Sequence, residues 1–273
     1  MTEKGIKLGT MTLDGLDRAG GFDAAVRDYK WFYLGAEFCE NLIDEAVCGE
    51  AVRLQGLGKK VCLLTPMLSE KGIVRLDAVF KKLLKLVRLG SIKASGLEIT
   101  VNDFGAVELA RQNRLPFKLN SGRLLYDNIF DGTRRMLKAH SALGFEFFKE
   151  LGITRHEIST TGLRRRSNFT NAGAPGPGSR KFSLTLFYPY LNLTSARTCL
   201  VGMRDVEPED SAKGVTCARE CRICSFAVTH PSIKEKLVVR GNTVFLHFPG
   251  KFYRSEEALA ALRVDRLVYC PFQ

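Results

Sequence analysis

Histidine is scarce in this chain, and the side-chain arrangements of the common proteases cannot be read from it. Four histidines occur among 273 residues, and none belongs to the His-Glu-x-x-His helix that holds zinc in metalloproteases. No Ser-His-Asp set is recognisable either. His156 lies near the end of a predicted strand, and we interpret it as a hydrogen-bonded structural residue in preference to a site residue. These absences predict that the protein does not cleave peptides.

Long apolar runs are also absent. No stretch approaches the roughly 18 uninterrupted apolar residues of a membrane helix, so we expect no transmembrane segment. Residues 1–7 lack the apolar core of a signal peptide, and we expect a cytoplasmic protein. Thiols stay reduced in that compartment, where clustered cysteines indicate metal or redox chemistry in preference to disulfides.

Acidic residues are outnumbered, with 29 Asp and Glu against 41 Lys and Arg, which gives a net charge of +12. Such a balance suits an anionic partner, which could be a nucleic acid, a lipid surface, an acidic protein or a carboxylate substrate. It is equally consistent with a soluble enzyme that happens to be basic. Residues 163–181 form a Gly- and Pro-rich loop that carries Arg164, Arg165 and Arg166. Phe169 is almost the only aromatic residue there for base stacking, so a solvated loop is slightly favoured over an RNA contact.

Short apolar runs alternate with helical patterns along the chain. Strands that alternate with helices predict a parallel sheet, and eight of them predict an α/β fold of the (β/α)8-like barrel type, with an open doubly wound sheet as the competing architecture. We expect residues 1–273 to form a single barrel-like domain. The predicted strands are residues 6–9, 31–34, 61–64, 97–101, 117–120, 155–158, 182–187 and 266–269, and the predicted helices are 73–87, 103–111, 127–148 and 256–262.

Five of the eight cysteines stand where a metal cofactor could use them. Cys217, Cys221 and Cys224 lie close together, Cys199 lies shortly upstream, and Cys39 follows the second predicted strand. Loops at the carboxyl ends of barrel strands share one face, so Cys39 and Cys199 are expected to meet there. We expect residues 199–248 to be a cluster-binding insertion before the last strand, with a β-hairpin that turns at residues 241–242.

Three kinds of site fit this cysteine pattern. The first is structural zinc, for which only Cys221 and Cys224 have the usual Cys-x2-Cys spacing. The second is a radical S-adenosylmethionine site that uses Cys217, Cys221 and Cys224, although that motif normally follows the first strand. The third is a four-cysteine 4Fe-4S site that draws on Cys39 and Cys199. The remaining Cys48, Cys62 and Cys270 are interpreted as core or surface thiols.

Several motifs resemble the collagenase-like peptidase family, number thirty-two of the unassigned peptidases, and within it the UbiV-like branch. They are the Tyr-Leu-Gly-Ala-Glu-Phe-Cys run that ends at Cys39, the Ser-Ala-Arg run before Cys199, the pair Cys217 and Cys221, and the Asp-Phe-Gly-Ala-Val run that starts at Asp103. The resemblance implies that Cys39, Cys199, Cys217 and Cys221 hold a 4Fe-4S cluster. Thr198 and Cys224 depart from the branch pattern, and Cys224 is an alternative ligand.

The same resemblance implies a function. It suggests a subunit of an oxygen-independent hydroxylase that acts on a ubiquinone precursor, in a heterodimer with a paralogous UbiU-like subunit and with prephenate as co-substrate. Relatives that hydroxylate tRNA or rRNA offer an alternative, and a non-enzymatic electron-transfer or scaffold subunit is a third. Glu37 and Arg197 are candidate catalytic residues, because arginine pairs with carboxylates and both lie near the cysteines, although Glu37 could cap a helix and Arg197 could neutralise thiolates.

Overall fold

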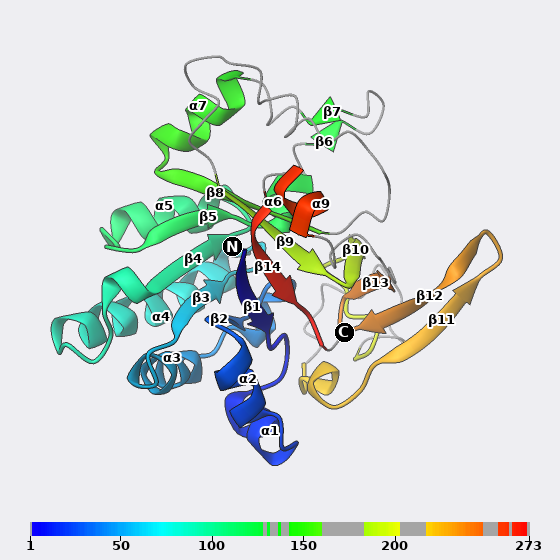
Figure 1. The fold of residues 1–273 in the computed structure, drawn as a ribbon, viewed down its shortest axis with the longest axis horizontal. Coiled ribbons are helices and arrows are strands. Elements are labelled where there is room, and N and C mark those ends of the chain that lie inside the picture. Colours follow the sequence, from blue (N-terminus) through cyan, green and yellow to red (C-terminus); the bar gives the residue numbers. More distant parts are fainter. Residues whose placement is uncertain are drawn as a thin grey trace.

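Eight parallel strands close into a barrel in the computed structural model of this chain (Figure 1). The structure describes residues 2–127, 130–131, 136–137, 142–159, 183–202, 217–247, 256–261 and 264–271. The first strand closes the barrel because it pairs with both the second and the last, so the open sheet is excluded and the (β/α)8 barrel is confirmed. In barrel order the strands are β1 (Glu3–Lys7), β14 (Val264–Tyr269), β9 (Ser183–Tyr188), β8 (Ile153–Ser159), β5 (Lys118–Ser121), β4 (Leu97–Val101), β3 (Lys60–Leu64) and β2 (Trp31–Gly35).

Helices cover the outside of the barrel. Side-chain caps begin several of them: the Ser69 hydroxyl accepts a hydrogen bond from the amide of Gly72 at the start of one, and the Asp103 carboxylate accepts one from the amide of Ala106 at the start of another. The helices are α1 (Leu13–Arg18), α2 (Phe22–Asp28), α3 (Ala46–Gly56), α4 (Glu70–Arg88), α5 (Phe104–Gln112), α6 (Arg123–Asp127), α7 (Ala142–Glu150) and α9 (Glu256–Ala261), with short 3-10 turns η1 (Glu40–Leu42), η2 (Ala94–Gly96) and η4 (Glu220–Arg222).

The expected helix over residues 127–148 is wrong in its first half. Helix α6 ends at Asp127, and two short antiparallel strands follow, β6 (Phe130–Asp131) and β7 (Met136–Leu137), before α7 begins. Asp131 and Gly132 form an Asp-Gly pair, a strong turn signal that interrupts the helical pattern.

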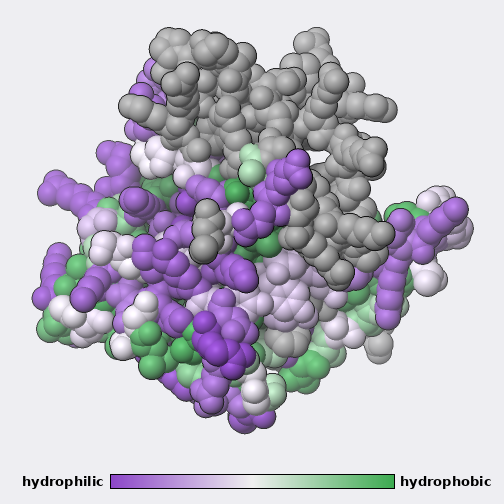
Figure 2. All heavy atoms as spheres, in the orientation of Figure 1, coloured by the Kyte–Doolittle hydropathy of each residue, from purple (hydrophilic) through white to green (hydrophobic). Residues whose placement is uncertain are grey.

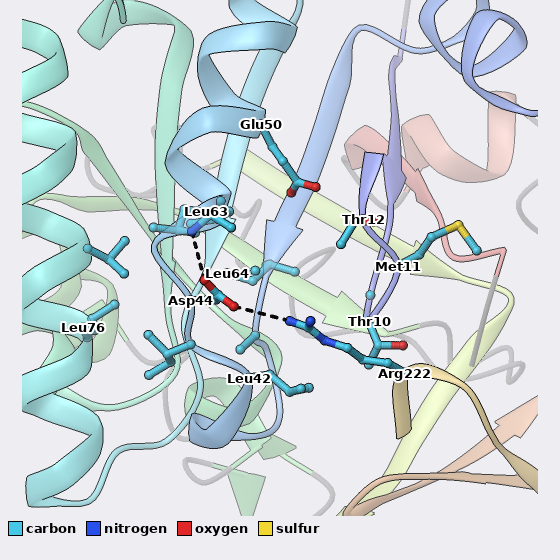
Figure 3. Close-up of a pocket in the computed structure, with 17 residues that line it drawn as sticks. Thr10, Met11, Thr12, Leu42, Asp44, Glu50, Leu63, Leu64, Leu76 and Arg222 are labelled. Atoms are coloured by element: carbon cyan, nitrogen blue, oxygen red, sulfur yellow. Dashed lines mark hydrogen bonds and ion pairs between the residues drawn. The ribbon is translucent and has the colours of Figure 1, made fainter. Parts of the chain in front are cut away.

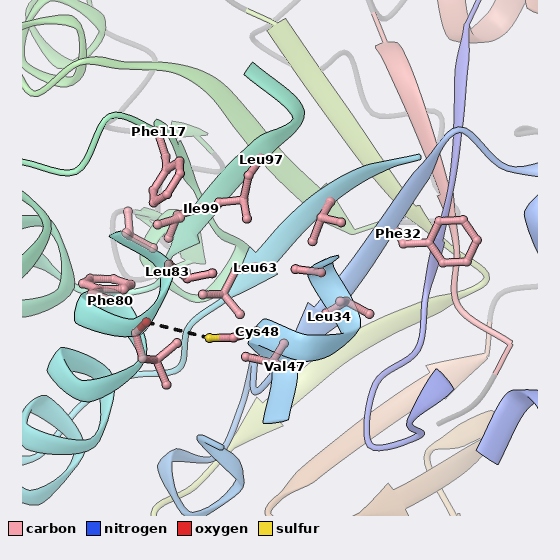
Figure 4. Packing of buried hydrophobic residues seen from close by; sticks show 14 of the residues in the cluster. Phe32, Leu34, Val47, Cys48, Leu63, Phe80, Leu83, Leu97, Ile99 and Phe117 are labelled. Atoms are coloured by element: carbon pink, nitrogen blue, oxygen red, sulfur yellow. Dashed lines mark hydrogen bonds between the residues drawn. The ribbon is translucent and has the colours of Figure 1, made fainter. Parts of the chain in front are cut away.

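The main hydrophobic core lies between the barrel and its helices (Figure 4). Leu63 points outward from β3 toward side chains such as Phe80 and Leu83 of α4, and Phe32 and Leu34 belong to the same core. Each such buried side chain contributes roughly 1.5–3 kcal/mol relative to an exposed one. This outer core is why α4 shows a clear helical period in the sequence.

The barrel interior is more polar than this outer core. Near the amino ends of the strands, Arg266 Nη1 donates to Glu98 Oε2 at 2.7 Å and to the Tyr33 hydroxyl at 2.9 Å, and its guanidinium lies 3.6 Å from the centre of the Trp31 ring. Arg266 is almost fully buried. A buried charge is costly unless it is paired, and these contacts supply the partners that allow the Arg266 guanidinium to be buried inside the barrel.

A second sheet is inserted between β9 and β14. Its strands, in order, are β10 (Tyr190–Ser195), β13 (Thr243–His247), β12 (Ile233–Arg240) and β11 (Phe226–His230). The expected hairpin is therefore present as β12 and β13, and it turns at Gly241 with a φ of 60°. The added sheet begins at Tyr190, earlier than residue 199, because β10 pairs with β13.

Hairpin β11–β12 projects away from the barrel (Figure 1). Figure 2 shows hydrophilic side chains over much of the described part of one face of the molecule, with hydrophobic groups between them. Within the described ranges, no helix combines the length and the apolar character needed to cross a membrane.

Candidate cysteine centre at the carboxyl end of the barrel

Four cysteines from distant segments lie within electrostatic reach of one another. Cys39 follows β2, Cys199 follows β10, and Cys217 and Cys221 lie before and within η4. Burial, together with the smaller effects of the neighbouring thiols of Cys39, Cys199 and Cys217, raises the pKa of Cys221 to about 11. Burial likewise raises the pKa of Cys39, to which Cys217 and Cys199 add. These four are the cysteines that the family resemblance groups, and their thiols lie near enough to one another to shift the pKa values of Cys39 and Cys221.

The turn of the β12–β13 hairpin connects three cysteine-bearing segments. Arg240 Nε donates to the carbonyl of Cys221 at 2.8 Å. Asn242 Nδ2 donates to the carbonyl of Phe38, beside Cys39, at 2.7 Å, and to that of Ala196 at 2.5 Å. The amide of Leu200, beside Cys199, donates to the carbonyl of Gly241 at 3.0 Å. Each segment is thus held by the same short turn.

Gly241 leaves room for a thiol. Its φ of 60° lies in the left-handed region that favours glycine. A Cβ atom added at this position would lie 3.3 Å from Cys221 Cβ and 3.5 Å from Cys221 Sγ. Glycine therefore suits both the backbone conformation and the close approach of the turn to Cys221.

The donor set is thiol-only at these four positions, which is the ligand chemistry of 4Fe-4S clusters. Within the described residues, no three His, Cys, Asp or Glu side chains are grouped so that they could hold a metal ion. The thiols therefore converge on one region without forming a coordination shell. A cluster of several irons is wider than a single ion, so its ligands surround a larger volume. The four thiols match such a group in donor chemistry.

The other cysteines have different surroundings. Cys224 is exposed, and its thiol donates to the carbonyl of Glu220 at 3.2 Å, within its own turn. Cys48 lies in the outer core. Cys62 Sγ lies 3.1 Å from Thr100 Oγ1 inside the barrel, and Cys270 is buried at the end of β14.

Glu37 forms a buried ion network beside the cysteines. Arg123 donates to both carboxylate oxygens of Glu37, at 2.7 Å from Nε and 2.7 Å from Nη2, and Lys7 Nζ contacts the same carboxylate. Burial opposes ionisation of Glu37, but the charges of Arg123 and Lys7 outweigh it and lower its pKa to about 2. A small cavity lined by Lys7, Glu37, Cys39, Cys221 and other residues joins this network to the cysteine centre.

The network continues into the added sheet. Arg123 Nη1 donates to Ser159 Oγ at 2.9 Å, and Ser159 Oγ donates to Asn192 Oδ1 of β10 at 2.8 Å. The Arg123 guanidinium also lies 4.4 Å from the centre of the Phe187 ring. Residues on β8, β9 and β10 therefore fix the position of Arg123 and, through it, of Glu37.

A second acidic side chain, Glu157 of β8, is fully buried in the barrel interior. Thr100 Oγ1 donates to its Oε1 at 2.9 Å, and its Oε2 has no hydrogen-bond partner in the described part of the chain. Burial, and then the charge of Glu37, raises the pKa of Glu157 to about 8. In the sequence, Glu157 is marked by its position near the end of a predicted strand, and the alternation of β8 puts it on the same face as Arg155.

The remaining predicted residues have varied positions. Asp103 is a helix cap and also accepts from the amide of Leu68 at 2.6 Å. His156 is buried, with Nδ1 2.7 Å from Ser121 Oγ, and burial lowers its pKa to about 4. Arg197 is exposed. The arginine run 164–166 lies outside the described residues.

Neither a protein-family model nor a curated protein matches the chain. Among solved structures, it is similar to the putative copper homeostasis protein CutC from Streptococcus agalactiae, with a TM-score of 0.47, 10% identity and 98% of each chain covered. It is also similar to a glycoside hydrolase family 18 N-acetylglucosaminidase from Paenibacillus barengoltzii, with a TM-score of 0.39, 9% identity, and 98% of this chain and 94% of the other covered. Identities this low carry no information on function.

Proposed function

We propose that this protein is a 4Fe-4S subunit of an oxygen-independent hydroxylase, of the UbiV-like type in the collagenase-like peptidase family. It acts on a ubiquinone precursor together with a paralogous UbiU-like subunit. Cys39, Cys199, Cys217 and Cys221 hold the cluster. When bound, the cluster supplies electron transfer or organises the hydroxyl transfer.

The observation that carries this proposal is the hydrogen bonding of one hairpin turn to three cysteine segments. Asn242 bonds beside Cys39, Gly241 bonds beside Cys199, and Arg240 bonds to Cys221. Contacts of this kind hold thiols from distant parts of the chain around one space. They favour the four-cysteine set over a radical S-adenosylmethionine set, which needs Cys224.

One further feature supports the proposal. Every residue of β11 is exposed, and in the described part of the chain this strand pairs only with β12. An open strand edge of this kind suits a protein partner.

Glu37 has both carboxylate oxygens occupied and stays ionised at neutral pH. These contacts favour a positioning role for Glu37 over proton transfer. Arg197 stays a candidate site residue, and its exposed side chain could reach a substrate or partner.

Anaerobic purification tests the cofactor directly. We expect a brown protein with about four irons and matching acid-labile sulfide per chain. Stoichiometric zinc without sulfide would show that the cluster assignment is wrong.

The net charge of +12 favours RNA hydroxylation as the second candidate function. A deletion strain grown without oxygen separates the two by its quinones and modified nucleosides. Loss of a hydroxylated quinone supports the first proposal, and loss of a hydroxylated nucleoside supports the second. If neither changes and the purified protein degrades peptides, with Cys199→Ala as active as the wild type, both are wrong.

A further inference from the structure

Asp44 joins the loop after β2 to the segment that carries Cys217 and Cys221. Its Oδ2 atom accepts a hydrogen bond from Arg219 Nη1 at 2.8 Å. The same oxygen lies 3.7 Å from Nη2 of Arg222, which reaches toward it from the cysteine segment (Figure 3). Arg219 lies between the two cysteines in the sequence, and Arg222 directly follows Cys221. One carboxylate therefore contacts the cysteine segment at two points.

The carboxylate of Asp44 is itself held in place. Its Oδ1 atom accepts a hydrogen bond from the amide of Ala46 at 3.0 Å, where α3 begins. The two oxygens thus have separate partners, with α3 on one side and the cysteine segment on the other. Helix α3 belongs to the outer core through buried residues such as Val47 and Leu54. Asp44 therefore connects the cysteine segment to a well-packed part of the fold.

The segment that Asp44 contacts is a compact turn around η4. The amide of Arg222 donates to the carbonyl of Arg219 at 2.9 Å, and the amide of Cys224 donates to the carbonyl of Glu220 at 3.0 Å. Arg219 has a φ of 61°, in the left-handed region that is costly for residues other than glycine. Such a conformation persists where surrounding contacts hold it, and the hydrogen bond to Asp44 is one of these contacts.

The two thiols of this turn have opposite surroundings. Cys221 is buried, whereas Cys224 is exposed. Thr10 and Arg240 both donate to the carbonyl of Cys221, and so they anchor the backbone of the turn near that residue. An anchor near one residue leaves a short turn free to rotate about it. The side-chain contacts of Asp44 supply a second attachment, which fixes the direction in which each thiol faces.

We propose that Asp44 is a positioning residue that selects Cys221 over Cys224 as a ligand of the cysteine centre. By holding Arg219 and Arg222, its carboxylate keeps the turn oriented with Cys221 toward the other thiols. The inference rests on the proposed function and deepens it, because it names what decides which thiol completes the four-cysteine set. The ion pair is partly exposed, so its loss should have a graded effect on the centre.

Alkylation of the full-length protein without iron tests the orientation of the turn. Asp44→Asn keeps an oxygen for the amide of Ala46 and removes the charge that holds Arg219. The rate at which iodoacetamide modifies Cys221, measured by mass spectrometry of its peptide, should rise at least about threefold. The rate at Cys48 should not change, because that thiol is buried in the outer core. An unchanged rate at Cys221 would overturn the proposal.

Two further variants separate positioning from general stability. Arg219→Asn should act like Asp44→Asn, because asparagine tolerates the left-handed region but carries no charge for the ion pair. Asp265→Asn is the matched control, since Asp265 accepts from Arg155 Nη1 at 2.7 Å at the amino end of the barrel, and it should leave Cys221 protected. Faster modification of Cys48 in the Asp44 and Arg219 variants would indicate general destabilisation and contradict a positioning role.

Iron content tests the choice of ligand. In the otherwise wild-type protein, Cys224→Ala should keep its iron. In the Asp44→Asn protein, the same substitution should lower the iron content at least about threefold, because Cys224 then replaces Cys221 in part of the molecules. An equal effect of Cys224→Ala in the two proteins would show that Asp44 does not select the ligand.

Failure of the cofactor proposal would look different. A wild-type protein that holds no iron, but in which Asp44 protects Cys221 from alkylation, would support the orientation of the turn and overturn the cluster. An iron-loaded protein in which Asp44→Asn changes neither the alkylation of Cys221 nor the effect of Cys224→Ala would do the reverse.

Discussion

Asn242 Nδ2 donates a hydrogen bond to the carbonyl of Phe38 at 2.7 Å, and the same amide group donates to Ala196 at 2.5 Å. One side chain therefore joins the loop after β2 to the loop after β10. Each loop carries a cysteine of the proposed centre, so the relative position of Cys39 and Cys199 depends on this amide.

Asn242→Ala is expected to lower the iron content of the anaerobically purified protein severalfold. The substitution removes both hydrogen bonds and should cost about 1–3 kcal/mol of unfolding free energy. Asn113→Ala is the control, because Asn113 also makes two side-chain hydrogen bonds, to Asp77 and Leu109, away from the cysteines. Equal loss of iron in both variants would mean that general destabilisation, and not positioning, is responsible.

Cys39→Ala should lose the cluster as readily as Cys217→Ala, whereas Cys224→Ala should largely keep it. The reason is that Cys39 and Cys217 are among the mutually interacting thiols, while the exposed Cys224 thiol bonds to Glu220 in its own turn. Iron and sulfide analysis of the three variants measures this. The opposite order, with Cys224 required and Cys39 dispensable, is what a radical S-adenosylmethionine enzyme predicts.

Gly241→Ala should reduce both stability and iron content. A non-glycine residue in the left-handed region costs about 1–2 kcal/mol, and the new methyl group would also press on Cys221. Gly58→Ala isolates the first effect, because Gly58 has a φ of 72° and open space around its Cβ position. Iron content should therefore fall only in the Gly241 variant, and a normal iron content there would refute the close-packing argument.

Glu157→Gln should stabilise the protein at alkaline pH. The pKa of Glu157 is raised from 4.5 to about 8, so its contribution to stability is complete below about pH 4.5 and is lost as the pH rises through 8. Over that window the wild type loses at most about 1.4 kcal/mol per pH unit from this group, a loss that the glutamine variant avoids. Chemical denaturation between pH 5 and pH 9 measures the difference in unfolding free energy between the variant and the wild type. A difference that does not grow with pH would contradict the raised pKa of Glu157.

Glu37→Gln should lower the stability of the protein at neutral pH, in contrast to Glu157→Gln. The carboxylate is ionised with a pKa of about 2, so its contribution is present above the ordinary value of 4.5 and is lost as the pH falls toward 2. Breaking this buried pair should cost about 3–5 kcal/mol at neutral pH. Denaturation at pH 7 tests this, and a loss below about 1 kcal/mol would show that Lys7 and Arg123 do not need Glu37.

The strands of the barrel could be predicted because their apolar runs are local and their spacing is regular. The rule that loops at carboxyl strand ends share a face predicted that Cys39 and Cys199 would meet. In the structure Cys39 does follow a barrel strand, but Cys199 follows β10 of the added sheet, so the rule alone does not account for its position. The helix over 127–148 failed where an Asp-Gly turn signal competed with helical spacing. The interior ion network was missed because Lys7, Glu37 and Arg123 meet only when the barrel closes, and charged residues are usually solvated. The contacts of Asn242 could not be predicted either, because they join its side chain to backbone groups far away in the sequence and leave no periodic pattern of residues.

The position of the added sheet has a consequence for the order of folding. Phe38 and Asn242 are 204 residues apart in the sequence, and most of the barrel strands lie between them along the chain. Contacts of such high sequence separation form slowly, since a long loop must be closed first. On the ribosome, Cys39 emerges long before the turn that fixes its loop. The turn that fixes the loop before Cys39 is therefore made late in synthesis, so the proposed cluster would be assembled only once translation is nearly complete.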